Sequence, residues 1–340
     1  MSDQRRSLGA TGVVTSALGL GCATLFHLSR PAERRAVLDM AFFHGITHFD
    51  VAPMYGLGLA ELELGSFLQG RRDGVTVTTK FGINTTPFGR AAGRMQGPAR
   101  AVLQRLPRVS RGLKSSGRST GSGLGRLMYT SEPYSPETVR RSLDRSLALL
   151  QTDYVDVFLV HDPTNALLSS SGELADHLSS EVAKGRIRTW GSAADVNLPT
   201  GEVRYFAESS PVLQFRDNIF ERHAVAASEL NKGIITFGVM EGALPSLRRY
   251  FDRSDSERAT WSARLGFDVL GPEALAHLLL RQAIYRNQTG PVLFSSTRID
   301  RVRGAAALAE GDPSAMRDEA LAVDELTVTI RRAEEGAATL

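Results

Sequence analysis

Cysteine and long apolar runs are both scarce in this sequence. Its 340 residues include one cysteine, Cys22, which excludes an internal disulfide and a cysteine-rich metal site, and we expect no bound metal. No apolar run approaches the ~20 residues that a membrane-spanning helix needs, and the N-terminal residues lack the apolar core of a signal peptide. The sequence therefore predicts a cytoplasmic protein without a membrane partner.

Acidic residues are absent from one long stretch, residues 82–131. That stretch holds nine of the 40 arginines and lysines and none of the 37 aspartates and glutamates. The rest of the chain is mildly acidic, so the sequence pI of about 9.2 reflects this stretch rather than the whole molecule. Nucleic-acid-binding domains usually carry their basic residues on the folded body, so we expect no nucleic-acid partner.

Eight short runs rich in β-forming residues recur along the chain and are separated by helical patterns. Most are nearly continuous apolar segments, which is typical of strands buried on both faces of a parallel sheet. The runs are 17–21, 48–52, 75–80, 155–161, 187–193, 212–215, 233–239 and 291–296.

Helices predicted between these runs have recognisable ends. Ser29 and Ser135 each stand shortly before a first-turn proline, the order typical of an N-cap followed by a helix. Further helices are predicted at 60–68, 172–185 and 273–287, with a short helix at 99–106 and an amphipathic one in the carboxyl tail at 318–336.

The alternation of strands and helices predicts an α/β fold, a (β/α)₈ TIM barrel. We expect a single barrel domain over residues 1–340, with residues 82–131 inserted after the third strand as a basic, partly flexible loop over the active-site rim. A doubly wound sheet is the alternative. It is disfavoured because no G-x-G-x-x-G motif follows any predicted strand.

Polar residues stand where three consecutive strands end. Asp50, Lys80 and His161 lie at or near the ends of the second, third and fourth runs, and Tyr55 lies in the loop after the second. Each alone has an ordinary structural explanation, such as a turn former or a solvated lysine. In a barrel, however, the loops after the strands meet on one rim, where active sites lie, so together they predict an active site.

The chemistry that suits these four residues is proton transfer at a carbonyl group. An unperturbed tyrosine has a pKa of about 10, and a neighbouring ammonium lowers it by favouring the phenolate. An aspartate keeps the lysine charged and oriented, and a histidine can donate to the carbonyl oxygen. None of these groups supplies electrons, so we expect a nicotinamide nucleotide as the hydride donor.

Three segments resemble signature sequences of the aldo-keto reductases. They are HFDVAPMYGLGLAELELG at 48–65, VTTKFG at 77–82 and DYVDVFLVHDP at 153–163. The resemblance implies a (β/α)₈ barrel and NAD(P)H-dependent interconversion of a carbonyl and an alcohol. It implies Tyr55 as general acid–base, Lys80 as the residue that lowers its pKa, Asp50 as the partner of the lysine, and His161 as the group that orients the substrate.

The resemblance also implies a cofactor site, which we expect to hold NADP, with NAD as the alternative. An arginine fork suits a 2′-phosphate because it binds bidentately, and Arg301 stands where the family holds that phosphate. Gln214 stands where the family binds the nicotinamide carboxamide. The full set of implied cofactor residues is Gly21, Cys22, Asp50, Ser192, Gln214, Phe237, Gly238, Ser295, Ser296 and Arg301.

The chain departs from the family pattern after the fifth strand. The family has Gly-Val-Ser-Asn there and uses the serine and asparagine for the carboxamide, whereas this chain reads Gly-Ser-Ala-Ala-Asp at 191–195. We expect Ser192 or Asp195 to substitute. Asp217 stands in place of the family's stacking tyrosine, and Ala305 where an asparagine often meets the adenine.

The substrate is expected to be a small carbonyl compound or sugar. Position on the rim suggests Phe26, Met54 and Trp190 as pocket wall, and the basic insertion suggests a cationic lid that attracts an anionic substrate, against the alternative of a solvated loop. A sugar dehydrogenase or nucleotide-deoxysugar reductase would use the same chemistry. The non-enzymatic alternative is a cofactor-binding sensor or regulatory subunit with little turnover. The oligomeric state is left open.

Overall fold

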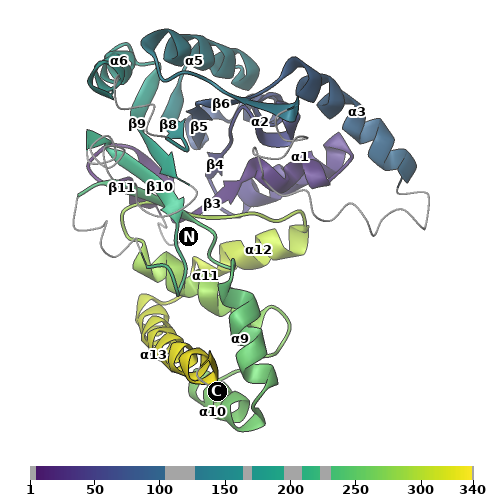
Figure 1. Ribbon diagram of the computed structural model, residues 1–340, viewed down its shortest axis with the longest axis vertical. Helices are drawn as coiled ribbons and strands as arrows, with labels where there is room; N and C mark the ends of the chain where they lie inside the picture. The colour runs from purple at the N-terminus through teal and green to yellow at the C-terminus, as the bar shows by residue number, and fades with distance from the viewer. Residues whose placement is uncertain (1–4, 104–126, 164–170, 195–208, 223–230, 339–340) are drawn as a thin grey trace.

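Eight parallel strands form a closed barrel in chain order, and helices lie against its outer face (Figure 1). The structure is a computed structural model whose described residues are 5–103, 127–163, 171–194, 209–222 and 231–338. Each predicted run supplies one barrel strand, so the (β/α)₈ prediction is confirmed. The strands are β3 (Leu18–Gly21), β4 (His48–Asp50), β5 (Thr76–Phe81), β8 (Val155–His161), β9 (Ile187–Ala194), β10 (Val212–Arg216), β11 (Gly233–Phe237) and β12 (Val292–Phe294).

The helices follow the predicted order and add three that the sequence did not suggest. Every predicted helix is present, and α9, α10 and α12 are additional. The helices are α1 (Pro31–Phe43), α2 (Ala60–Leu68), α3 (Pro87–Leu103), α5 (Pro136–Leu150), α6 (Ser171–Ala183), α9 (Ala243–Asp252), α10 (Asp255–Leu265), α11 (Ala274–Arg286), α12 (Ile299–Leu308) and α13 (Pro313–Ala338). Three short 3₁₀ helices are η1 (Cys22–His27), η2 (Tyr55–Leu57) and η3 (Arg72–Gly74).

One of the two predicted serine N-caps is correct and the other is wrong. The Ser135 side chain accepts a hydrogen bond from the backbone N–H of Thr138 at the start of α5. At α1 the N-cap is Arg30, which has an extended backbone, so Ser29 lies one residue too early to cap the helix. The backbone N–H of Arg30 instead donates to the Glu33 side chain at 3.4 Å.

An N-terminal hairpin closes one end of the barrel. Its strands are β1 (Arg5–Ser7) and β2 (Val14–Ser16), paired antiparallel. Leu8 and Val13 at its tip join the inner apolar cluster, which includes Val157, Leu159, Ile235 and Leu293. Gly9 has a positive φ of 53°, and a Cβ there would lie 2.3 Å from the backbone of Gly233, so only glycine fits. The hairpin does not cover the opposite end of the barrel, at the carboxyl ends of the strands, so an active site can lie there.

The insertion after β5 begins and ends as an antiparallel pair. Its strands are β6 (Ile83–Thr85) and β7 (Tyr129–Ser131). The helix predicted at 99–106 starts earlier than expected, since α3 begins at Pro87. A Cβ at Gly93 would lie 2.9 Å from the Leu57 side chain, so α3 packs directly on the loop that contains Tyr55. The flexible segment predicted at 112–125 lies outside the described residues.

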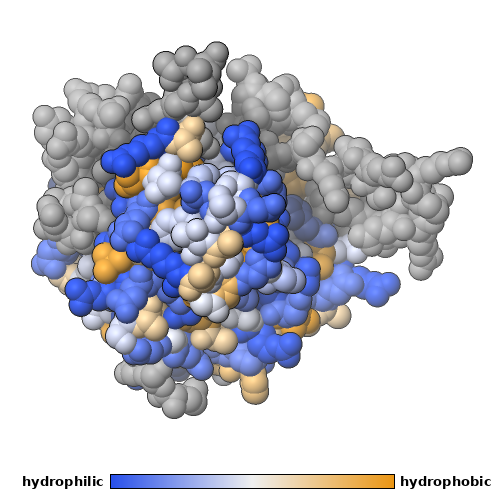
Figure 2. All heavy atoms as spheres, turned by 90° about the horizontal axis from the view of Figure 1, so that it is seen from below, coloured by the Kyte–Doolittle hydropathy of each residue, from blue (hydrophilic) through white to orange (hydrophobic). Residues whose placement is uncertain are grey.

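Helices α9, α10, α11 and α13 form a group at one end of the molecule (Figure 1). Figure 2 views this end from below, where hydrophilic side chains predominate and hydrophobic ones are scattered. The predicted tail helix is confirmed as the longer α13, which packs on α11. Along the described residues, none of the helices combines the length and apolar character needed to cross a bilayer. The cytoplasmic location and the single-domain organisation stay predictions.

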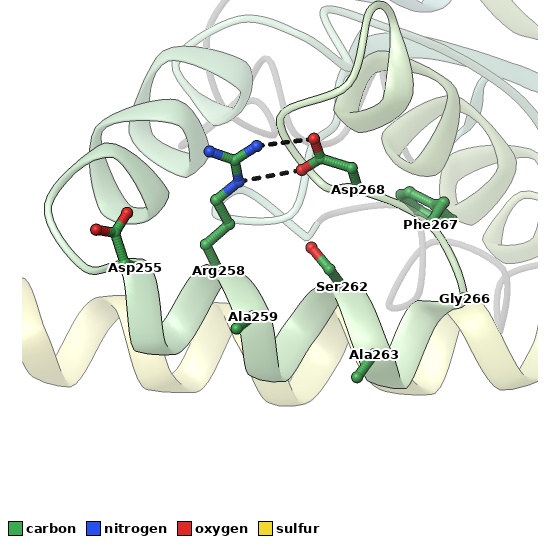
Figure 3. A pocket seen from close by; sticks show the side chains of 8 residues that line it. All are labelled: Asp255, Arg258, Ala259, Ser262, Ala263, Gly266, Phe267 and Asp268. Atoms are coloured by element: carbon green, nitrogen blue, oxygen red, sulfur yellow. Dashed lines mark hydrogen bonds and ion pairs between the residues drawn. The ribbon is translucent and has the colours of Figure 1, made fainter.

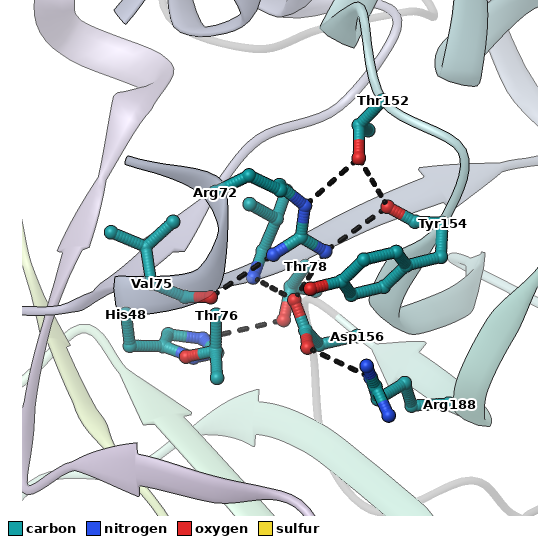
Figure 4. A network of polar contacts seen from close by, with 10 residues as sticks. His48, Arg72, Val75, Thr76, Thr78, Thr152, Tyr154, Asp156 and Arg188 are labelled. Atoms are coloured by element: carbon teal, nitrogen blue, oxygen red, sulfur yellow. Dashed lines mark hydrogen bonds and ion pairs between the residues drawn. The ribbon is translucent and has the colours of Figure 1, made fainter. Parts of the chain in front are cut away.

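A buried polar network holds β5, β8 and β9 together on the barrel wall (Figure 4). Asp156 accepts hydrogen bonds from Arg72 Nη2 and from the backbone N–H of Val77, each at 2.8 Å. The Tyr154 ring lies near both Arg72 and Arg188, whose guanidinium carbons are 3.8 and 4.5 Å from its centre. Burial raises the pKa of Asp156 and the arginines oppose that shift. The network is satisfied within the fold and leaves no group aimed at a ligand.

Candidate active site

The strand register turns three of the predicted residues toward the inside of the barrel. Asp50 pairs with Thr78 of β5, and Lys80 lies two residues beyond Thr78, so both point the same way. Lys80 pairs with Leu159 of β8, which belongs to the inner apolar cluster. His161 lies two residues beyond Leu159 and therefore also faces inward.

Lys80 is the centre of the site. Its side chain is 1% exposed, and Nζ donates to Asp50 Oδ1 at 2.7 Å, to the carbonyl of Val51 at 3.2 Å and to Tyr55 Oη at 3.3 Å. Burial by itself lowers the pKa of Lys80, but negative charge on Asp50 and on Tyr55 outweighs it, so the pKa is raised. The ammonium is therefore charged at neutral pH and lies against the phenol oxygen.

Tyr55 and His161 face each other across the mouth. Their ring centres are 6.3 Å apart and their planes are nearly perpendicular, at 89°. Tyr55 belongs to η2, where Gly56 has a φ of 59° and would place a Cβ only 2.3 Å from the Phe26 ring. Gly56 thus lets the loop fold tightly enough to bring the phenol back over Lys80. Phe26 lies beside this loop, and the partly exposed Met54 precedes Tyr55, while their role as pocket wall stays a prediction.

Gln214 has a role that sequence reasoning missed. Its Nε2 donates to Asp50 Oδ2 at 2.7 Å, so the two oxygens of this buried carboxylate are held by Lys80 and Gln214. The pairing joins residues on opposite sides of the barrel. No local pattern in the sequence indicates it, because only the closed circle of strands brings β4 and β10 near each other.

The register does not support Ser192 as the carboxamide group. Ala193 pairs with His161 on one side and Gln214 on the other, so it is Ala193 that faces inward at the mouth. Ser192 faces the helical layer, and its buried Oγ has no hydrogen-bond partner among the described residues. The expectation for Ser192 is therefore wrong, and Asp195 lies outside the described residues.

Trp190 is also placed differently from the prediction. It lies on the same outward face of β9 as Ser192, 6% exposed and packed in the cluster between barrel and helices. It lines a hollow together with Thr11 of the N-terminal hairpin and Lys232, which precedes β11, at the end of the barrel opposite the site. Trp190 therefore cannot form a substrate wall.

Two residues of the implied cofactor set, Gly21 and Ser295, are in contact. Ser295 Oγ donates to the carbonyl of Gly21 at 2.9 Å, and a Cβ at Gly21 would lie 2.6 Å from that hydroxyl. Cys22, next along the chain, is fully buried at the start of η1, and burial raises the pKa of its thiol. It is thus an unreactive apolar contact rather than a nucleophile.

The residues expected near the phosphates lie at the ends of β11 and β12. Phe237 ends β11, and Gly238 follows with a φ of 79°. The α12 helix begins after Arg298, whose backbone N–H donates to Ser296 Oγ at 3.1 Å. Arg301 in its first turn is ion-paired with Glu273 at 2.7 Å. This helix start, with no side-chain cap at Arg298, suits a nucleotide phosphate.

His48 lies in the barrel one inward position before Asp50. It is fully buried, and its two ring nitrogens lie 2.9 and 3.3 Å from the hydroxyls of Thr76 and Thr78. Burial lowers its pKa to about 4, so the imidazole is neutral at physiological pH. It therefore adds no positive charge beneath Asp50 and Lys80.

A second hollow of about 570 Å³ lies on the surface along α10 (Figure 3). Arg258 and Asp268 form a bidentate pair across it at 3.1 and 2.8 Å. The other lining residues are small or apolar apart from Asp255 and Ser262. Since its charged pair is satisfied internally, this hollow is a poorer candidate for chemistry than the barrel mouth.

Two curated proteins and a solved structure are similar to the chain. It is 34% identical over 164 residues to pyridoxal 4-dehydrogenase of Microbacterium luteolum, covering 47% of this chain and 44% of that protein. It is 31% identical over 169 residues to D-threo-aldose 1-dehydrogenase of a Pseudomonas species, covering 48% and 45%. Each match thus spans less than half of the relative's length.

A crystal structure of an aldo-keto reductase from Klebsiella pneumoniae in complex with NADPH superposes with a TM-score of 0.59 at 21% identity, covering 91% of this chain and 90% of that one. This likeness supports the barrel fold. The family model described as "Aldo/keto reductase family" matches residues 17–199, which is more than half of the sequence. The chain belongs to the aldo/keto reductase family.

Proposed function

We propose that the protein is an NADP-dependent oxidoreductase that interconverts a carbonyl group and an alcohol, with Tyr55 as general acid–base. The observation that carries this proposal is the buried Lys80 ammonium, 3.3 Å from Tyr55 Oη and 2.7 Å from Asp50 Oδ1. A charged donor beside a phenol oxygen favours the phenolate and eases proton exchange near neutral pH.

Each residue of the site has a distinct part in this mechanism. Tyr55 Oη gives a proton to the carbonyl oxygen during reduction and takes it back during oxidation. Lys80 stabilises the phenolate, and Asp50 holds Lys80 while Gln214 holds Asp50. His161, facing Tyr55 across the mouth, orients the substrate oxygen by hydrogen bonding.

Bound NADPH would supply the hydride for reduction, bound NADP⁺ would accept it in the reverse direction, and this chain offers groups for most of the nucleotide's length. Gly21 and Ser295 would lie along the ribose, Phe237 and Gly238 along the pyrophosphate, and the start of α12 at the adenosine phosphate. Ser296 and Arg301 support a 2′-phosphate and hence NADP over NAD, with Arg301 exchanging its ion pair with Glu273 for the phosphate. The Klebsiella relative, in complex with NADPH, supports the same preference.

The proposed substrate is a small aldehyde, ketone or sugar, and an anionic one is favoured. The names of the two relatives, a pyridoxal dehydrogenase and an aldose dehydrogenase, support carbonyl and sugar chemistry. Residues 82–131 contain no acidic residue, and α3, the described helix of this stretch, packs on the Tyr55 loop, which supports a negatively charged substrate.

A second function, a cofactor-binding regulatory protein with little turnover, is favoured by one observation. The inward position beside His161 and Gln214 carries the methyl group of Ala193 rather than a hydroxyl. That loss removes a hydrogen bond to the carboxamide but leaves the acid–base residues intact, so we favour the enzyme.

Replacing Tyr55 with phenylalanine tests the proposal. The substitution removes the transferred proton and leaves the ring packing, so we expect turnover of an aldehyde, ketone and sugar panel to fall by about 10²–10⁴-fold. Binding of NADPH, measured by fluorescence quenching, should stay within about twofold. Tyr154 lies just before the start of β8, at the other end of the strand from His161, so Tyr154→Phe is the matched control and should retain activity.

The outcomes separate the two functions. Cofactor binding without turnover by the wild type across the panel would favour the regulatory protein. No binding of NADPH or NADH by the wild type would contradict both.

A further inference from the structure

Three arginines, Arg90, Arg94 and Arg145, form a cluster beside the Tyr55 loop, which we call the arginine cluster. Arg90 and Arg94 lie one turn apart on α3, and Arg145 is on α5. Arg145 Nη1 donates to Asn84 Oδ1 at 2.8 Å, and Arg90 Nη1 donates to the carbonyl of the next residue in β6. Two guanidinium groups from different helices therefore meet over one short strand.

The positive charge of the arginine cluster is not neutralised by ion pairs. Among the described residues, no carboxylate lies within ion-pair distance of any of its three arginines. The pKa of Arg90 is lowered by partial burial and by the neighbouring charges of Arg145 and Arg94. Glu132 is linked to the arginine cluster only through Asn84. Its carboxylate accepts a hydrogen bond from Asn84 Nδ2 at 3.3 Å, so Asn84 lies between Glu132 and Arg145. Buried Glu61 also interacts electrostatically with Arg145, and burial raises the pKa of Glu61, so two acids among the described residues face three arginines and the site stays net positive.

The arginine cluster is next to the catalytic loop. Arg90 Cγ lies 3.2 Å from the Cβ position of Gly58, three residues after Tyr55.

We propose that the arginine cluster binds an oxyanion of the phosphate class, carried by the carbonyl substrate or free in solution. Two or three guanidinium groups match the charge and the several acceptor oxygens of a phosphate better than those of a single carboxylate. The substrate form of this proposal rests on the proposed oxidoreductase activity. The binding site itself does not.

Isothermal titration calorimetry with inorganic phosphate measures binding at the arginine cluster and does not depend on enzymatic activity. Arg90→Gln and Arg145→Gln should each weaken binding by about tenfold, because each removes a charged hydrogen bond. Arg94→Gln, at an exposed position, covers the case in which a more buried variant fails to fold, and should weaken binding by at least about threefold. Arg141→Gln is the matched control, because Arg141 lies on α5 with Arg145 but is paired with Glu137. This variant should bind phosphate as the wild type does.

Two results of this titration would overturn the proposal. One is the absence of phosphate binding to the wild type. The other is binding that is lost in Arg301→Gln at the start of α12 and unaffected in the three cluster variants, which would assign the phosphate to the nucleotide site.

Matched aldehydes distinguish the source of the phosphate. With NADPH, glyceraldehyde 3-phosphate should have a KM at least about tenfold below that of glyceraldehyde if the substrate carries the group, and Arg145→Gln should abolish that preference. Equal KM values, together with phosphate binding at the arginine cluster, support the site as one for a free anion. If the enzyme turns over neither aldehyde, that result counts against the oxidoreductase activity. The phosphate titration alone then tests whether the arginine cluster is a binding site.

Discussion

At the scale of single residues, Ala193 and Ser192 make a natural pair for testing the cofactor site. Ala193→Ser restores a hydroxyl at the inward position between His161 and Gln214. We expect NADPH to bind about two- to tenfold more tightly, because one net hydrogen bond contributes about 0.5–1.5 kcal/mol. The dissociation constant from fluorescence quenching measures this.

The control for that change is Ser192→Ala. The Ser192 hydroxyl faces the helices and is buried without a partner among the described residues, so its removal should leave NADPH binding unchanged. Weaker NADPH binding in Ser192→Ala would show that the register at the mouth differs from the one described.

His48 predicts a pH dependence of stability. Its pKa is lowered from 6.5 to about 4 in the folded protein, so between these values the unfolded chain binds the extra proton and the folded one does not. Stability attributable to His48 therefore falls as the pH drops through this window, by up to about 3 kcal/mol. His48→Asn removes this dependence. Its unfolding free energy relative to wild type should rise from pH 7 to pH 4, as measured by urea denaturation.

A His48→Asn profile parallel to that of the wild type would mean that the buried imidazole accepts a proton as easily as an exposed one.

At the scale of helices and strands, the two serines before prolines test helix capping. Ser135 accepts from the backbone N–H of Thr138 at 3.2 Å, whereas Ser29 lies one residue before the N-cap of α1. Ser135→Ala should lower the free energy of unfolding by about 1 kcal/mol, and Ser29→Ala by clearly less. Urea midpoints of the two variants measure the difference. Equal losses would contradict the assignment of Arg30 as the N-cap.

Strand and helix positions could be predicted from the sequence because their signals are local. The continuous apolar runs gave all eight barrel strands within a few residues, and proline positions gave the starts of α1 and α5. The α10 helix also had a local signal, since the backbone N–H of Glu257 donates to Ser254, but this was not recognised in the sequence. Which face a strand residue occupies was not predictable for β9, because a run buried on both faces shows no alternation.

At the scale of the whole molecule, the site exists because the barrel closes. Asp50, Tyr55, Lys80 and His161 could be named from the sequence since three of them end consecutive strands. The bond between Gln214 and Asp50 could not, because it spans 164 residues and depends on the closed circle of strands. The wrong placements of Trp190 and Ser192 have the same origin, as both required the register of β9 with its neighbours.

The helices at the far end test whether the molecule unfolds as one unit. Leu326 on α13 is fully buried, whereas Val328 on the same helix is 49% exposed. Leu326→Ala should lower the free energy of unfolding by about 2–5 kcal/mol, and Val328→Ala by at most about 0.5 kcal/mol. The two tryptophans report on different parts, since Trp190 is in β9 and Trp261 in α10.

Urea unfolding followed by fluorescence in Trp190→Phe and Trp261→Phe backgrounds therefore separates the signals of the barrel and of the far helices. If the chain is one cooperative domain, Leu326→Ala shifts the Trp190 and Trp261 unfolding transitions together, because loss of packing between α13 and α11 destabilises the whole domain. A shift confined to the Trp261 signal, with the Trp190 transition unchanged, would show that α10 and α13 unfold independently of the barrel and would contradict a single-domain organisation.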